Sequence, residues 1–235
     1  MRFLIFQLVC FSYVMASANS FTDKHIDPFL QRASDQTSLK IVLAGTASVL
    51  LAKPNDDHVR DQWVGHQQMS KDTSHVGDLL GSGAAGTLLM GGQALWDENE
   101  NHYESHFRAL VYTTVATTSM KYGFGRSRPG NSDSHQSFPS GHTATAFATA
   151  TSLTYAYGWK AAAIAYPLAS FVALSRLADD AHWISDLVGG AFVGFLVARA
   201  SSYEYSENRL IESSKLEIYP VIGQGDLSLK ISYIY

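Results

Sequence analysis

The sequence predicts an all-α protein, a helical bundle followed by a short C-terminal β-hairpin. Three observations indicate this class: long uncharged stretches closed by charged residues, loops rich in Gly, Pro, Asn and Asp between them, and an apolar alternation confined to the end of the chain. At 235 residues, 46% apolar and 16% charged, the chain is too hydrophobic for a disordered protein. It therefore fits one domain with additional segments.

The first element, residues 1–18, has the pattern of a secretory signal peptide. Arg2 gives a positive start, an apolar run follows to Ala16, and Ala16-Ser17-Ala18 is a small-x-small cleavage pattern, so we expect cleavage after Ala18. An uncleaved anchor and a lipid-modified Cys10 are alternatives. The run is shorter than the ~20 residues of a membrane span, and Cys10 lies inside it. This single cysteine excludes a disulfide within the chain.

The following elements are helices, marked by uncharged stretches that end at Lys, Arg or Asp. Most of these stretches are shorter than the ~20 residues of a membrane span, and the longer ones contain several Gly or His, Ser and Thr residues. We therefore expect core helices of a soluble bundle, with a polytopic membrane protein as the alternative. The stretches are Ile41–Ala52, Leu79–Trp96, Ala109–Met120, Ser134–Trp159, Ala161–Ser175 and Leu187–Ala198.

Loops and the tail complete the organisation. Lys53–Asp57, Asp97–Asn101 and Gly125–Pro139 are predicted loops. Two alternating runs, Leu216–Val221 and Leu227–Tyr235, flank a Gly-Gln-Gly-Asp turn, which predicts a hairpin. The expected division is a signal peptide at 1–18, a helical domain at 19–202 and a tail at 203–235.

Basic residues gather at the end of the third long stretch, although the chain has a net charge of −4. This charge gives no general attraction for nucleic acid, so anion binding needs a local cluster. Lys121, Arg126 and Arg128 form such a cluster before Pro129. Taken alone, they could simply oppose a helix dipole.

A second segment, Ser140-Gly141-His142, opens a predicted helix. Free backbone N–H groups at a helix start, with a hydroxyl beside them, bind phosphate-like anions. The alternative is that Ser140 caps the helix and His142 is an exposed residue of its first turn.

A third segment contains Arg176, His182 and Asp186. If it is helical, His182 and Asp186 share one face, and the carboxylate can hold the imidazole in one tautomer as a nucleophile or base. The alternative is an ordinary surface pair. We expect Asp179 and Asp180 to be loop and cap residues.

Together the segments resemble the three-part signature of the type 2 phosphatidic acid phosphatase superfamily, which also includes class A bacterial acid phosphatases and vanadium haloperoxidases. The match consists of Lys121-x6-Arg128-Pro129, then Pro139-Ser140-Gly141-His142, then Ser175-Arg176-x5-His182-x3-Asp186. It implies that family's helical bundle. The residues before Pro139 differ from those of class A acid phosphatases, and the roles of His135 and Arg126, in substrate contact or on the surface, are left open.

The resemblance also implies the chemistry. His182 would attack phosphorus and form a phosphohistidine, Asp186 would orient it, and His142 would protonate the leaving oxygen and then activate water. The phosphate oxygens would be bound by Lys121, Arg128, Ser140, Gly141 and Arg176. No metal or other cofactor is expected, because phosphoryl transfer needs positioning and fixed positive charge.

We therefore expect an exported, metal-independent phosphomonoester phosphatase in the periplasm of a Gram-negative bacterium. Its expected partners are phosphorylated small molecules or lipids and not nucleic acid; peripheral membrane contact and the oligomeric state are left open. Two alternatives remain. One is a vanadate-dependent haloperoxidase, and the other is a non-catalytic, anion-binding envelope protein attached through the tail.

Overall fold

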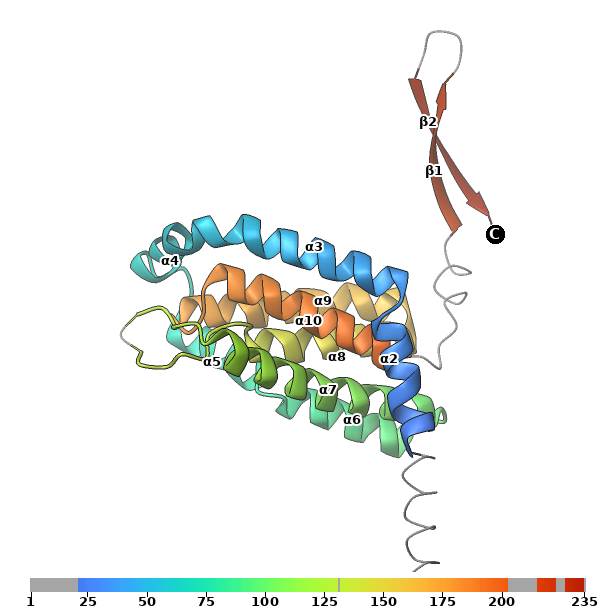
Figure 1. The fold of residues 1–235 in the computed structure, drawn as a ribbon, viewed down its shortest axis with the longest axis horizontal. Coiled ribbons are helices and arrows are strands. Elements are labelled where there is room, and N and C mark those ends of the chain that lie inside the picture. Colours follow the sequence, from blue (N-terminus) through green and yellow to red (C-terminus); the bar gives the residue numbers. More distant parts are fainter. Residues whose placement is uncertain (1–20, 131, 203–214, 223–226, 235) are drawn as a thin grey trace, which may run out of the picture. The chain divides into compact units, whose positions relative to one another are not determined.

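The computed structural model describes residues 21–130 and 132–202, and the backbone of 215–222 and 227–234. The signal peptide expected at 1–18 lies outside the described residues. The chain divides into a helical unit that ends at Tyr203 and a unit that begins at Glu204 (Figure 1). The helical unit contains a π-helix Thr22–Ile26, α2 Asp27–Ala33, α3 Gln36–Ala52, a 3-10 turn Lys53–Asn55, α4 Asp56–Gly65, α5 Lys71–Gly81, α6 Ala84–Trp96, α7 Glu100–Phe124, α8 Gly141–Tyr157, α9 Trp159–Ala178 and α10 Ile184–Ser201.

Local sequence signals set several helix ends. Asp35 caps α3 by accepting from the Ser38 N–H, and Ser70 caps α5 by accepting from the Thr73 N–H. At the other end of a helix, Gly125 terminates α7 with a φ of 55°, a left-handed conformation that glycine adopts without strain. The chain after Gly125 is therefore free to form the loop that leads to α8.

Helix α10 lies at the centre of the bundle, against α8, α7 and α3 (Figure 1). Glycine makes its contact with α8 very close: a Cβ added at Gly194 would lie 2.1 Å from the Ala144 carbonyl oxygen, and one added at Gly190 would lie 2.6 Å from that of Ser140. The backbones of the two helices that carry the second and third segments therefore touch directly.

The side chains are distributed in an unusual way for a soluble bundle. The buried apolar core of the helical unit consists largely of alanine, including Ala109, Ala148 and Ala198 at 0% exposure. Large apolar side chains point outward instead, among them Leu51 at 76% and Trp96 at 82% exposure. Small residues inside and large apolar residues outside are typical of helices that pack within a lipid bilayer.

Four helices, α3, α7, α9 and α10, are longer than the uncharged stretches that predicted them. Helix α9 has 20 residues, a mean hydropathy of 1.5 and 28% of its span buried, whereas α10 has 18 residues, a mean hydropathy of 1.4 and 61% of its span buried. Both have the length and composition of a membrane span, whereas the sequence predicted shorter helices at these positions, so the predicted bounds were wrong. The error arose because Lys160 and Arg176 lie within α9 and were read as its boundaries.

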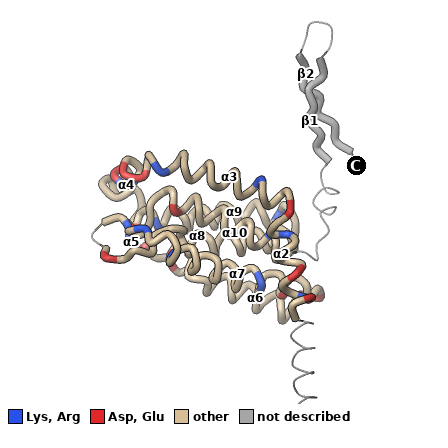
Figure 2. The backbone as a smooth tube through the Cα atoms, in the orientation of Figure 1, with Lys and Arg blue, Asp and Glu red and all other residues tan. Residues whose placement is uncertain are grey.

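Figure 2 shows the charged residues mainly at the two ends of the bundle, with few along its middle. Helices α6 and α8 contain no Lys, Arg, Asp or Glu. In α10 the charged residues are Asp186 in the first turn and Arg199 in the last. An uncharged middle zone therefore crosses the bundle.

The described part of the second unit is a pair of strands, β1 Lys215–Ile222 and β2 Leu227–Ile234. They pair antiparallel, with Lys215 opposite Ile234 and Ile222 opposite Leu227. The residues between the strands lie outside the described part of the chain. The helical unit itself confirms the predicted all-α class.

Candidate active site

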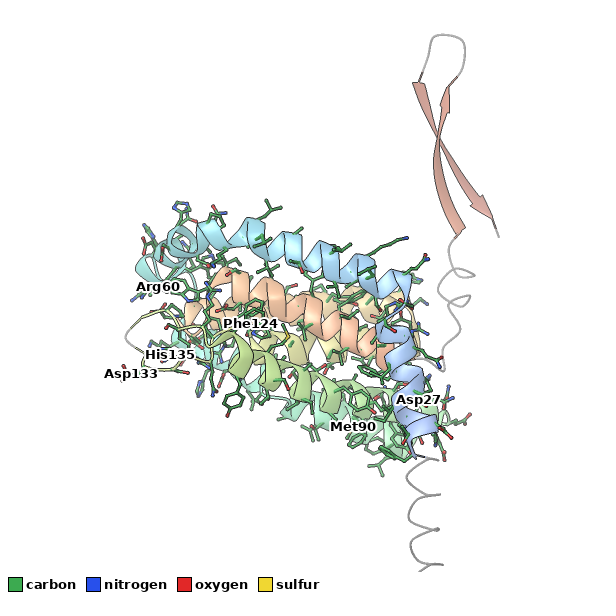
Figure 3. The ribbon with its side chains drawn as sticks, viewed as in Figure 1. Asp27, Arg60, Met90, Phe124, Asp133 and His135 are labelled. Atoms are coloured by element: carbon green, nitrogen blue, oxygen red, sulfur yellow. The ribbon has the colours of Figure 1, made fainter. Side chains whose placement is uncertain are left out.

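The three predicted segments meet at one end of the bundle. Helices α7 and α8 are joined there by the loop 125–140, and α9 and α10 are joined there by residues 179–183. In Figure 3 this end is marked by Arg60, Asp133 and His135, and the opposite end by Asp27. Segments far apart in sequence thus contribute to one site.

His182 and Asp186 form a buried pair at the start of α10. Nδ1 of His182 lies 3.6 Å from Oδ2 of Asp186, and the two side chains are only 3% and 0% exposed. His182 precedes the helix, which begins at Ile184, and Asp186 is in its first turn. A surface pair is therefore excluded, and the Nε2 atom is the ring nitrogen turned away from the carboxylate.

The loop before α8 adds a hydroxyl to this pair. Ser137 Oγ donates a 2.5 Å hydrogen bond to Asp186 Oδ2 and lies 3.4 Å from His182 Nδ1. The Trp183 backbone N–H also donates to Asp186 Oδ2, at 3.0 Å. The carboxylate oxygen that faces the imidazole is thus held from two directions.

Arg126 holds the other oxygen of the same carboxylate. Its Nη1 donates to Asp186 Oδ1 at 2.5 Å and to Ser185 Oγ at 2.7 Å, and its Nη2 donates to Asp56 Oδ2 at 2.6 Å. Asp56 also accepts from the Ser185 N–H and hydroxyl. Arg126 is therefore neither a surface residue nor a free anion-binding group, but a bridge between two buried carboxylates.

The environment of His182 keeps it uncharged at neutral pH. Burial, helped by the positive charges of Lys121 and Arg128, lowers the pKa of His182 to about 4 against the opposing effect of Asp186. A neutral imidazole has a free lone pair on one nitrogen. Because Asp186 and Ser137 lie at Nδ1, that lone pair is available at Nε2.

Lys121 and Arg128 supply positive charge beside both histidines. Lys121 Nζ donates to the Gln136 carbonyl at 2.7 Å, and its Cε lies 3.9 Å from where a Cβ on Gly141 would be. Burial and the charge of Arg128 lower the pKa of Lys121 to about 8. Arg128 Nε is buried and has no hydrogen-bond partner among the described residues. Two such cations side by side favour a bound anion.

The second segment forms the N-terminus of α8. Ser140 is fully buried, and its hydroxyl accepts from the Thr143 N–H, so it does cap the helix. The Ser140 N–H donates to the Asp186 carbonyl at 3.0 Å, which fastens the start of α8 to α10. Gly141 and His142 are then the first helical residues, where backbone N–H groups are free to face an anion.

Arg176 and His142 converge on an aspartate of α5. Arg176 pairs with Asp78 and Asp179, and His142 Nε2 lies 3.1 Å from the same oxygen of Asp78 that Arg176 Nη1 contacts. Burial and the nearby charges of Arg128 and Lys121 lower the pKa of His142. Arg176 itself is buried.

The remaining predicted polar residues lie around this centre. His135 is an exposed loop residue whose ring nitrogen contacts the Asp133 carbonyl at 3.0 Å, which agrees with the solvated alternative. Asp180 receives two hydrogen bonds from Arg60. Within residues 21–130 and 132–202, no group of three or more His, Cys, Asp or Glu side chains is placed to hold a metal ion.

Three polar residues of the site did not stand out in the sequence: Asp56, Asp78 and Ser137. Asp56 lay in a predicted loop and Asp78 directly before an uncharged stretch, where nothing links them to residues more than sixty positions away. Ser137 gave a weak signal, because it lies three residues before Ser140. Their roles depend on contacts that only the fold creates.

Comparisons with known proteins agree with this arrangement. Residues 105–210 match the family model of the PAP2 superfamily. A lipid A 1-phosphatase of Porphyromonas gingivalis is 39% identical over 125 residues, which are 52% of this chain and 22% of that protein. This chain thus matches about a fifth of the length of that curated relative.

A solved structure shows the same fold. The crystal structure of Aquifex aeolicus LpxE matches with a TM-score of 0.55 and 23% identity, over 62% of this chain and 93% of that one. The matched family region includes all three segments that form the site. The part of the chain that carries the site is therefore similar to the type 2 phosphatidic acid phosphatase (PAP2) superfamily.

Proposed function

We propose that this protein is a membrane-associated phosphatase that hydrolyses phosphomonoesters of lipids through a phosphohistidine intermediate. The observation that carries the proposal is the buried His182, neutral at Nε2 and held at Nδ1 by Asp186 and Ser137. A histidine in this state is a nucleophile ready to attack without prior loss of a proton. The positive charges of Lys121 and Arg128 lie beside it.

In the first step, His182 Nε2 forms a bond to phosphorus as the bond from phosphorus to the leaving oxygen breaks. Protonated His142 gives its proton to that oxygen, and the alcohol leaves. The imidazole of His182 becomes positively charged, and the Asp186 carboxylate stabilises it. In the second step, water attacks phosphorus, His142 takes its proton, and the P–N bond breaks to release inorganic phosphate.

The phosphate oxygens carry the negative charge that must be stabilised in both steps. We assign Lys121, Arg128 and Arg176, with the Ser140 hydroxyl and the Gly141 N–H, to this role. The unpartnered Nε atoms of Arg128 and Arg176 support the assignment, because buried N–H groups without partners favour an anionic ligand.

A lipid substrate is supported by the apolar exterior and by the relatives. Lipid contact explains why side chains such as Leu51 and Trp96 are exposed around an uncharged middle zone. The relative from P. gingivalis is named for a lipid substrate. We place the site at the level where the bilayer meets water, since charged residues gather at the ends of the bundle (Figure 2).

A small apolar cavity near the site would receive the first part of an acyl chain. It has a volume of about 90 Å³, lies between α5, α6, α8 and α9, and is lined by residues that include Leu80, Ala146 and Val172. Val172 also borders Gly81, where an added Cβ would lie 2.9 Å from His142 Cβ. Val172, which lines the cavity, and His142, the proposed general acid, therefore both lie against Gly81.

Export belongs to the proposal as well. The pattern of residues 1–18 would direct the chain across the inner membrane and place the site on the periplasmic side. N-terminal sequencing of the protein from cell membranes tests this: a new N-terminus at Asn19 is expected, and an intact leader would contradict cleavage.

The central experiment measures phosphate release by the detergent-purified protein from phosphatidic acid, from a phosphorylated glycolipid and from p-nitrophenyl phosphate. Hydrolysis should persist in EDTA, be inhibited by vanadate and be lost in His182→Ala. The control is His135→Ala, which removes an exposed histidine at the same end of the bundle and should remain active. Absence of phosphate release from all three substrates would overturn the proposal. Bromide oxidation by peroxide after vanadate loading would indicate a haloperoxidase instead.

A further inference from the structure

We propose that Asp78 is a positioning residue that keeps His142 in the protonated form required of the general acid. Asp78 belongs to none of the three motif segments and reaches the site from α5. Its Oδ1 atom lies 3.1 Å from His142 Nε2 and also pairs with Arg176 Nη1. This inference rests on the proposed function, since it assigns His142 the proton of the leaving group.

The packing of α5 shows how Asp78 is placed. Gly77 and Gly81 lie on either side of it, and both allow α5 to approach the site closely. A Cβ on Gly77 would lie 2.3 Å from Ser175 Cβ, and one on Gly81 would lie 2.9 Å from His142 Cβ. Larger residues at either position would push α5, and with it the carboxylate, away from His142.

The charges around His142 show why it needs a carboxylate. Among the residues that the structure describes, Asp78 is the one acidic side chain within ion-pair distance of His142. Asp186 pairs with Arg126 and lies against His182, and Asp179 pairs with Arg176. Two cations from other elements act on His142: Arg128 from the loop and Lys121 from α7. Arg176 of α9 pairs with the same Asp78 oxygen.

Burial and these cations favour the neutral imidazole, which has no proton to give at the step that needs one. A carboxylate at Nε2 favours the imidazolium instead. The same contact helps in the second step, because His142 becomes an imidazolium again when it takes the proton from water. One aspartate therefore supports His142 both as acid and as base.

The decisive variant is Asp78→Asn, which keeps the shape and removes the charge. Its kcat/KM profile on p-nitrophenyl phosphate should have an alkaline limb shifted by about 1 pH unit to lower pH, because loss of a nearby opposite charge lowers the pKa of His142. The acid limb, which reports His182, should move much less. Asp78→Glu should restore most of the alkaline limb.

Asp72→Asn is the matched control, because Asp72 lies on the same helix, exposed in its first turn. Its profile should equal that of the wild type. Direct titration of His142 by NMR of histidine-labelled protein gives a readout that does not depend on turnover. The His142 signal, assigned by its loss in His142→Asn, should titrate at lower pH in Asp78→Asn and, as a second uncharged variant, in Asp78→Ser.

Two results would overturn the inference. One is an unchanged His142 titration in both uncharged variants. The other is higher activity of Asp78→Asn at every pH, since the carboxylate would then be competing with phosphate for Arg176. An inactive wild-type protein would instead contradict the proposed function, and the NMR titration would still test the contact between Asp78 and His142.

Discussion

Arg126 donates a 2.5 Å hydrogen bond to Asp186, the carboxylate that lies against His182. The same guanidinium bonds Asp56, so one cation neutralises two carboxylates that are 0% and 8% exposed. Nothing in the spacing of the motif residues indicates this arrangement. It makes Arg126 a support of the nucleophile rather than a ligand of the substrate.

Replacing Arg126 with Ala should destabilise the protein strongly. Two buried carboxylates would lose their shared partner, and breaking a buried ion pair in this way costs about 3–5 kcal/mol of unfolding free energy. Thermal unfolding in detergent provides the measurement. The control is Arg60→Ala, whose partner Asp180 lies in a more exposed pair and which should cost about 1 kcal/mol or less. Equal losses in the two variants would show that Arg126 is not a buried bridge.

Removing the Ser137 hydroxyl should slow turnover with little change in KM. In Ser137→Ala, Asp186 loses a 2.5 Å hydrogen bond at the oxygen that faces His182. Hydrogen bonds to charged groups contribute about 1.5–3 kcal/mol, so kcat should fall on the order of 10- to 100-fold. Steady-state kinetics on p-nitrophenyl phosphate measures this, with Ser134→Ala in the same loop as control. A rise in KM alone would indicate substrate contact instead.

The pH dependence of kcat/KM should be bell-shaped with its optimum on the acid side. Protonation of His182, with a pKa of about 4, removes the nucleophile as the pH falls. Deprotonation of His142, whose pKa lies below its ordinary value of 6.5, removes the general acid as the pH rises. Initial rates from pH 3 to 9 test this assignment. A plateau that extends above neutral pH would contradict it.

Gly194→Ala should disturb the bundle and the site together. The added methyl group would overlap the Ala144 carbonyl oxygen, so α8 and α10 must separate, at a cost of about 1–3 kcal/mol. Gly91→Ala is the control, because a Cβ there meets nothing within 4 Å and should stabilise α6 by about 0.5–1 kcal/mol. The unfolding midpoint and kcat should therefore both fall in Gly194→Ala, whereas in Gly91→Ala the midpoint should rise and kcat should stay unchanged. A neutral Gly194→Ala would show that the two helices are not in backbone contact.

Filling the apolar cavity should reduce the hydrolysis of lipid substrates more than that of p-nitrophenyl phosphate. Ala146→Phe places a ring among residues that line the cavity, so hydrolysis of phosphatidic acid should fall on the order of 10-fold while p-nitrophenyl phosphate is still hydrolysed. Ala47→Phe makes the same change on an exposed position of α3 and should affect neither substrate. Equal losses on both substrates in Ala146→Phe would mean that the cavity supports the site without receiving a chain.

The motif residues could be found from the sequence because short spacings reflect local structure. His182 lies two residues before the start of α10 and Asp186 lies in its first turn, and the Ser-Gly pair before His142 marks a helix start. The structure brings these segments to one end because consecutive helices reverse direction there. The local sequence pattern was therefore enough to predict the residues at the centre of the site.

The residues that contact this centre from other helices could not be predicted in this way. The contacts of Asp56 with Ser185 and of Asp78 with His142 join residues separated by more than sixty positions, and their sequence neighbours carry no hint of the partner. The lengths of some helices were also underestimated. Lys160 and Arg176 lie near the two ends of α9 and made the predicted helix shorter than the observed one. Only the burial pattern shows that many of its side chains are exposed.

The alanine core has a consequence for how this protein tolerates change. Ala144, Ala148 and Ala198 are fully buried, so even one added carbon atom would clash with a neighbouring helix. Exposed positions such as Leu51 can accommodate apolar side chains of different shapes. Sequence variation should therefore be very low inside the bundle and, on the outside, high among apolar residues. The rigid interior also fixes the distance between His142 and His182, because each lies at or next to the first turn of a helix that cannot shift against the other.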